Sequence, residues 1–343
     1  MALRMTSSAV SETPDSNTGA STLRGRRIPV IDQMRGVALI AMAIYHFTWD
    51  LGFFGYVDPA TPATGGWKLF ARLIAGSFLF LSGCSLVLGH GNGIRWHSFA
   101  KRFARIVAAA AIITVGTWFA FPQTFIFFGI LHAMAAASLI GLAFLRVPAP
   151  LTILVAAAAF AAPWYLRSPF FDPPWLWWVG LSASVPRSND YVPVLPWIAP
   201  FLLGMAAFRI AVARGWTERF ASIGTGSAKW KTGLAAAGRH SLAIYLIHQP
   251  VIIALVYAFS LVAPAAKPDP VEAYRMNCTA ACTAQRDKTF CTAFCDCTLN
   301  RLLEQDLFNA LNAGAINVAS DGRIAAISEQ CTADSQSGLD LKE

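Results

Sequence analysis

The chain has 343 residues, of which 55% are hydrophobic and only 13% are charged. A soluble domain carries nearer a quarter charged residues, so this composition excludes an ordinary soluble protein. The net charge of +8 does not indicate nucleic-acid binding, because the basic residues fall in short loops between apolar runs and form no patch with interleaved aromatic residues.

Long apolar runs fill the first three quarters of the chain. A helix of about 20 apolar residues crosses the hydrocarbon core of a bilayer, so we expect about seven spans. Residues 1–27 are rich in Ser, Thr, Ala and Gly, and this predicts a disordered tail rather than a signal peptide. The expected spans lie at 29–52, 67–89, 104–121, 124–145, 150–167, 194–213 and 238–264, within a membrane domain of residues 28–264.

The fifth run, 150–167, is the weakest, because it is short and contains or adjoins three prolines. Between it and the sixth run, a Trp-rich stretch at 175–178 follows Pro173 and Pro174. Tryptophan favours the membrane–water interface, so this stretch predicts an interfacial loop or a short re-entrant piece.

Orientation follows from the Lys and Arg residues, which concentrate in cytoplasmic loops. With seven spans, all the basic loops fall on one side. The sequence therefore predicts a multi-pass protein of the cell (inner) membrane, with its N-terminus cytoplasmic and its C-terminus non-cytoplasmic. The basic residues of these loops are Arg24, Arg26, Arg27, Arg95, Lys101, Arg102, Arg105, Arg146, Arg214, Arg219, Lys229, Lys231 and Arg239.

A polar tail, residues 265–343, contains six of the seven cysteines. A non-cytoplasmic compartment is usually oxidising, which favours disulfides, and a four-cysteine zinc site is the rival interpretation. Cysteines four residues apart share a helix face, and two antiparallel turns would join them crosswise, although spacing alone does not fix the connectivity. The pairs would be Cys278 with Cys295, Cys282 with Cys291, and Cys297 with Cys331.

The tail also has an apolar stripe over 298–312, which predicts one helix that packs on the membrane domain or on a partner. The expected fold is therefore all-α: a polytopic bundle of membrane helices with a small, cysteine-rich helical C-terminal tail.

Four ionisable residues follow one face of the first span. Arg35 and His46 are eleven residues apart, which is three helical turns plus about 20°, and about 16 Å along the axis. Asp32 and Asp50 fall on nearly the same stripe. Because ionisable groups are costly inside a membrane, they usually face a cavity or a partner. His46 suits general-base work, Asp50 could hold its imidazole, and Arg35 could bind an anionic or carbonyl group.

Structural roles compete with each of these. Arg35 could extend to lipid phosphates, Asp32 could pair with it or sit at the positive helix end, and His46 could be an interhelical hydrogen-bonding residue. A transporter with an intramembrane His/Arg substrate or proton path is a rival function, although the sequence shows no convincing internal repeat. A third alternative is a non-catalytic scaffold with a secreted cysteine-rich module.

Further polar residues lie near or within other spans. His132 and His248 could line the same cavity or form helix–helix hydrogen bonds. Asp190 and Tyr191 precede the sixth span, and a capping role competes there with a role in binding. Cys84 has no base at helical spacing on its own helix, so a thiol nucleophile is not expected. A basic loop with two histidines could attract phosphates as well as fix the topology: His90, Arg95, His97, Arg102 and Arg105.

The Arg35–His46 spacing on a first membrane helix resembles that of the transmembrane acyltransferase superfamily. Further motifs in order over residues 28–262 resemble the prokaryotic branch of the heparan-α-glucosaminide N-acetyltransferase catalytic-domain family. The motifs are Asp32-Gln33-Met34-Arg35-Gly36, Tyr45-His46-Phe47, Trp49-Asp50-Leu51, Phe78-Leu79-Phe80-Leu81-Ser82-Gly83, Phe128-Gly129-Ile130-Leu131-His132, Asp190-Tyr191 with Pro196-Trp197, and the stretch from Gly238 to Pro250.

This resemblance implies that an acyl group, usually acetyl, passes from cytoplasmic acyl-CoA to a hydroxyl or amine of a sugar or glycan on the other side. His46 would match the catalytic histidine, and Arg35, with Asp32, the donor-binding arginine. The expected partners are the lipid bilayer, acyl-CoA as co-substrate and the glycan acceptor, with a second copy of the chain as a candidate. Acyl transfer needs no metal and no permanently bound cofactor.

Overall fold

The computed structural model describes residues 28–223, 228–266, 269–283, 286–316, 318 and 321–340. The tail expected at residues 1–27 lies outside this range. The described residues are helical, with two isolated β-bridges and no strand. The chain divides into two compact units that part between Leu261 and Val262.

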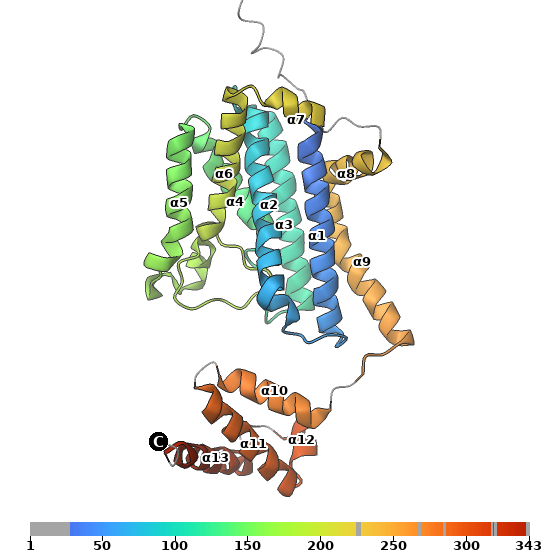
Figure 1. Cartoon of the computed structure of the whole chain (residues 1–343), viewed down its shortest axis with the longest axis vertical. Coiled ribbons are helices and arrows are strands. Elements are labelled where there is room, and N and C mark those ends of the chain that lie inside the picture. The colour runs from blue at the N-terminus through green and yellow to red at the C-terminus, as the bar shows by residue number, and fades with distance from the viewer. Residues whose placement is uncertain are drawn as a thin grey trace, which may run out of the picture. The chain divides into compact units, whose positions relative to one another are not determined.

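The first unit is a bundle of apolar helices (Figure 1). Five helices are long and apolar enough to cross a membrane, and α4 and α5 are shorter apolar helices. The expected all-helical membrane bundle is confirmed. These helices are α1 (Pro29–Phe53), α2 (Gly65–His90), α3 (Trp96–Ala120), α4 (Ile130–Phe144), α5 (Ala149–Tyr165), α6 (Val194–Ala213) and α9 (Ser241–Val262), with the short helices α7 (Thr217–Ile223) and α8 (Lys229–Arg239) before α9.

Two helix starts differ from the sequence prediction. Helix α3 begins at Trp96 rather than at 104, because polar residues extend it beyond the apolar run. Helix α4 begins at Ile130 rather than at 124. The residues before it pair with the segment that leads into α6, since Thr124 accepts a backbone hydrogen bond from Asn189 at 2.9 Å.

The seventh expected span, 238–264, is divided between α8 and α9, with the break at His240. Helix α8 lies across α1 (Figure 1). The two backbones come so close that a side chain on Gly36 would collide with the Leu234 carbonyl, and one on Gly238 with the Asp32 carbonyl. Glycine therefore places the end of α8 against the first turns of α1.

Glycine also sets the contact between α2 and α6. A side chain on Gly83 would collide with the carbonyl of Phe201, and one on Gly204 with the carbonyl of Phe80. Small residues allow membrane helices to approach closely and pack by van der Waals contact. The most deeply buried apolar residues of the unit lie around this contact: Leu79, Phe201, Leu202 and Met205.

The segment between α5 and α6 contains the Trp-rich stretch and folds into 3-10 turns, η2 (Pro169–Phe171) and η3 (Pro174–Val179). Asp172 closes this loop, because its carboxylate accepts a 2.6 Å hydrogen bond from Ser182, and this bond lowers the pKa of the carboxyl. Tyr191 donates to the Trp177 carbonyl at 2.7 Å. The loop is therefore an ordered element.

The second unit contains α10 (Pro270–Cys282), α11 (Lys288–Glu304), α12 (Phe308–Asn312) and α13 (Gly322–Asp340). Three disulfides join its helices, α10 to α11 twice and α11 to α13 once. The crosswise pairing expected from the spacing is confirmed. The bonds are Cys278–Cys295, Cys282–Cys291 and Cys297–Cys331.

The single helix expected at 298–312 is wrong. Helix α11 ends at Glu304, and α12 begins at Phe308 after a turn in which Asp306 has a φ of 54°. The turn redirects the apolar stripe, so that Leu299 and Phe308 pack into one core with Ile327. This stripe therefore contributes to the core of its own unit.

The glycine contact between α2 and α6 can be tested with two matched variants. Gly83→Ala places a methyl group against the Phe201 carbonyl, and overpacking of this kind costs about 1–3 kcal/mol. Gly76→Ala on the same helix meets nothing within 4 Å and removes a flexible residue. We expect a lower melting temperature in detergent for Gly83→Ala alone, and equal melting temperatures would contradict this packing.

The disulfides predict a distinctive alkylation pattern. In denatured but unreduced protein, only Cys84 has a free thiol. Mass spectrometry should therefore find one alkylated cysteine before reduction, together with linked peptides for the three pairs. Loss of Cys297–Cys331 should destabilise the second unit by about 2–4 kcal/mol. Linked peptides with any other pairing would refute the arrangement.

Candidate functional site

Arg35 is held inside the bundle between two helices. It donates a 3.1 Å hydrogen bond to Asp32 Oδ1, one turn earlier on α1, and a further bond to Ser85 Oγ on α2. The Ser85 hydroxyl in turn donates to the Leu81 carbonyl at 2.6 Å. The guanidinium is thus fixed by protein partners, which is the arrangement expected of an intramembrane charge with a defined position.

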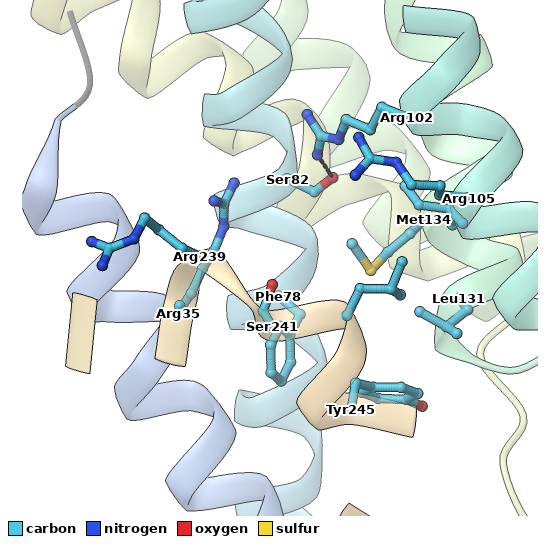
Figure 2. Close-up of a pocket in the computed structure, with 13 residues that line it drawn as sticks. Arg35, Phe78, Ser82, Arg102, Arg105, Leu131, Met134, Arg239, Ser241 and Tyr245 are labelled. Atoms are coloured by element: carbon cyan, nitrogen blue, oxygen red, sulfur yellow. Dashed lines mark hydrogen bonds between the residues drawn. The ribbon is translucent and has the colours of Figure 1, made fainter. Parts of the chain in front are cut away.

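A cavity of about 310 Å³ opens beside Arg35, between α1, α2, α3, α4 and the junction of α8 with α9 (Figure 2). On α3, Arg102 donates to Ser82 Oγ of α2 at 3.3 Å. We call the four basic residues of the lining the arginine cluster: Arg35, Arg102, Arg105 and Arg239.

The arginine cluster carries more positive charge than its surroundings neutralise. Arg102 interacts electrostatically with both Arg35 and Arg105. In the described part of the chain, Asp32 is the one carboxylate that forms an ion pair with the cluster. Like charges close together in a poorly solvated site are unfavourable, so the cavity favours an anionic ligand.

Further along α1, two histidines meet. The rings of His46 and His248 of α9 have centroids 4.9 Å apart and cross at 63°. His248 Nδ1 lies 2.7 Å from the Tyr245 carbonyl oxygen, which can only accept a hydrogen bond. Nδ1 therefore carries a proton, and in a neutral ring Nε2 holds a bare lone pair. Nε2 is buried without a hydrogen-bond partner among the described residues.

Asp50 lies one turn beyond His46 and is 0% exposed. The sequence suggested that it holds the His46 imidazole, but the structure gives it another partner. Gln249 Nε2 donates to Asp50 Oδ1 at 2.7 Å, and no hydrogen bond joins Asp50 to His46 among the described residues. The remaining polar atom of each side chain, Asp50 Oδ2 and Gln249 Oε1, is buried and has no hydrogen-bond partner among the described residues.

His132 has partners for both ring nitrogens. The Gly129 amide donates to Nδ1 at 3.2 Å, and Nε2 lies 3.2 Å from Thr114 Oγ1. Since Nδ1 accepts, the proton of a neutral ring lies on Nε2, which donates to Thr114. These bonds tie the start of α4 to α3.

Asp190 caps α4 from the loop before α6. Its Oδ2 accepts a 2.9 Å hydrogen bond from the Ile130 amide at the first turn of that helix. The carboxylate also interacts electrostatically with the hydroxyls of Tyr45 and Tyr245, and Tyr245 lines the cavity. Asp190 thus faces the interior of the bundle, whereas Tyr191 bonds within its loop.

Several site residues carry no clear signal in the sequence. Ser85 resembles any small residue of an apolar helix. Tyr245 and Gln249 lie in the 238–250 stretch that resembles the family, but that resemblance assigns neither of them a role. Gln249 also follows His248 directly, so a helical projection places the two on different faces. Among the described residues, no group of three or more His, Cys, Asp or Glu could hold a metal ion.

Comparison with known proteins places this arrangement in a family. The profile described as heparan-α-glucosaminide N-acetyltransferase, catalytic, matches residues 27–250, which include the arginine cluster and the His46–His248 pair. No curated protein and no solved structure matches the chain. The profile covers more than half of the 343 residues and stops before the cysteine-rich unit. The chain therefore belongs to the heparan-α-glucosaminide N-acetyltransferase catalytic-domain family of membrane acetyltransferases.

Proposed function

We propose that this acetyltransferase moves an acetyl group from acyl-CoA to a hydroxyl or amine of a sugar or glycan, with the two substrates entering from opposite ends of the bundle. One observation carries the proposal. A cavity lined by four arginines lies towards one end of α1, and His46, further along the same helix, meets His248 of α9 in a half-buried pair.

The positive charge of the arginine cluster suits the acyl-CoA donor. Coenzyme A is a polyanion, and arginine binds phosphate groups through several donors in a fixed plane. His46 lies about 16 Å beyond Arg35 along α1, so the extended arm of the coenzyme would carry the thioester from the cluster towards the histidines. Tyr245 lines the cavity, and His248 follows it by one turn on α9.

His46 would act as the general base. In this step an imidazole nitrogen takes the proton of the acceptor hydroxyl or amine, and the oxygen or nitrogen attacks the thioester carbonyl. The new C–O or C–N bond forms, the C–S bond breaks, and the coenzyme thiolate takes the proton back from the imidazolium. A general base of this kind contributes about 10²- to 10⁴-fold to the rate.

The orientation follows from charge. Helix α1 starts, and α2, α4 and α6 end, at the same end of the bundle (Figure 1). The basic loops lie at this end, which the positive-inside rule assigns to the cytoplasm. Acyl-CoA would enter there, and the acceptor would enter from the non-cytoplasmic face of the cell (inner) membrane.

Replacement of His46 tests the catalytic step. We expect His46→Ala to lower acetyl transfer from acetyl-CoA at least 100-fold while the Kd for coenzyme A stays within about twofold. Tyr165→Ala, which removes an exposed aromatic residue of α5 outside the cavity, should behave as wild type. Turnover that survives in His46→Ala would remove the histidine from the mechanism, and a wild type that binds the coenzyme without transfer would favour a transporter.

Charge removal in the cavity tests donor binding. Arg35→Ala and Arg102→Ala should each raise the Kd for coenzyme A roughly tenfold or more, because each removes charge-assisted hydrogen bonds. The matched control is Arg72→Ala on α2, an exposed arginine outside the cavity. Calorimetry on detergent-purified protein gives the three Kd values. An equal rise of the Kd in all three variants would mean that affinity depends on the net charge of the protein, and it would contradict specific binding at the arginine cluster.

A further inference from the structure

We propose that Asp50, His248 and Gln249 form the acceptor subsite, in which they bind hydrogen-bond donors of the incoming substrate. This assigns Asp50 to substrate binding instead of the orientation of His46. The inference rests on the proposed function and adds the residues that recognise the acceptor.

The three unpartnered atoms of this subsite have the same chemical character. Gln249 donates its amide to Asp50 Oδ1, so its Oε1 must face away from that bond. His248 donates from Nδ1 to the Tyr245 carbonyl, so its Nε2 is bare in a neutral ring. Asp50 Oδ2, His248 Nε2 and Gln249 Oε1 are therefore all hydrogen-bond acceptors, and each is buried and unpartnered among the described residues.

All three atoms are also buried. A buried polar atom without a partner is costly, and three on neighbouring side chains point to a ligand that satisfies them. Asp50 is 0% exposed, so lipid headgroups do not reach it from the surface. The matching ligand presents several N–H or O–H donors, whereas an aliphatic alcohol with one hydroxyl would leave acceptors unpaired.

The position of Asp50 along α1 suits an acceptor subsite. Arg35, His46 and Asp50 follow one another along the helix, and Asp50 lies about 22 Å from Arg35. Asp50 is in the last turn of α1, at the end away from the arginine cluster. An acceptor bound there meets the thioester at His46, between the two binding regions.

Asp50→Asn is the sharpest test, because it changes one atom and keeps the shape of the side chain. The new amide can still accept from Gln249 through Oδ1, but it places an N–H donor where Oδ2 was. With glucosamine as the probe, we expect the KM for the sugar to rise roughly tenfold or more, while the KM for acetyl-CoA stays within about twofold. Thr48→Val, on the same helix, is the matched control, since among the described residues the Thr48 hydroxyl donates to the Ile44 carbonyl of its own helix and to no other group.

Other outcomes separate this inference from the proposed function. If Asp50→Asn lowers kcat and moves the pH–rate profile with the KM for the sugar unchanged, Asp50 orients the base and the subsite is refuted. A second outcome is that the wild type consumes acetyl-CoA at a rate that glucosamine or glucose increases no more than cyclohexanol does. That result refutes the subsite but leaves the acetyltransferase activity supported. A wild type that leaves acetyl-CoA intact with every probe contradicts both. His248→Gln, which can still present an acceptor, should raise the KM less than His248→Leu.

Discussion

Polar side chains within an apolar bundle must find partners, and this requirement organises the structure. Arg35 and Arg102 reach α2 from different helices, and each bonds to a serine there, Ser85 and Ser82. We call the row of residues from the arginine cluster through His46 to Asp50 the polar path. At both of its ends, some charges or polar atoms have no protein partner. Among the described residues, the four arginines of the cluster form an ion pair with one carboxylate only, and three buried acceptor atoms around Asp50 have no hydrogen-bond donor. The two regions need opposite ligands. Negatively charged acyl-CoA would suit the arginine cluster, and a sugar with several O–H or N–H groups would suit the region around Asp50.

Close backbone contacts hold this polar path in place. Glycines at the α1–α8 and α2–α6 crossings bring the backbones together, and the side chains around them have little freedom to shift. Gly238 lies against α1 and also lines the cavity, so the same residue fixes the helix and shapes the site. On α9, the Tyr245 carbonyl holds the ring of His248, and the side-chain amide of Gln249 holds Asp50 of α1.

Much of this architecture could be predicted from the sequence, because hydrophobic run length and cysteine spacing are local signals. Spans and crosswise disulfides follow from them. The start of α4 and the break at His240 could not be predicted, since extended pairing before Ile130 and the crossing of α8 over α1 depend on distant residues. In the site, the periodicity of α1 placed Asp32 beside Arg35, and the ion pair is present. The same periodicity suggested that Asp50 serves His46, but a helical wheel carries no information about the facing helix, where Gln249 is its partner.

In the proposed function, the acyl donor and the acceptor reach His46 from opposite ends of the bundle, and transfer across a sealed membrane tests this arrangement. Purified protein would be reconstituted in vesicles loaded with glucosamine, and acetyl-CoA would be added outside only. We expect acetylated sugar inside the vesicles, with none formed by His46→Ala. Product that appears only when acetyl-CoA and the sugar share one compartment would contradict it.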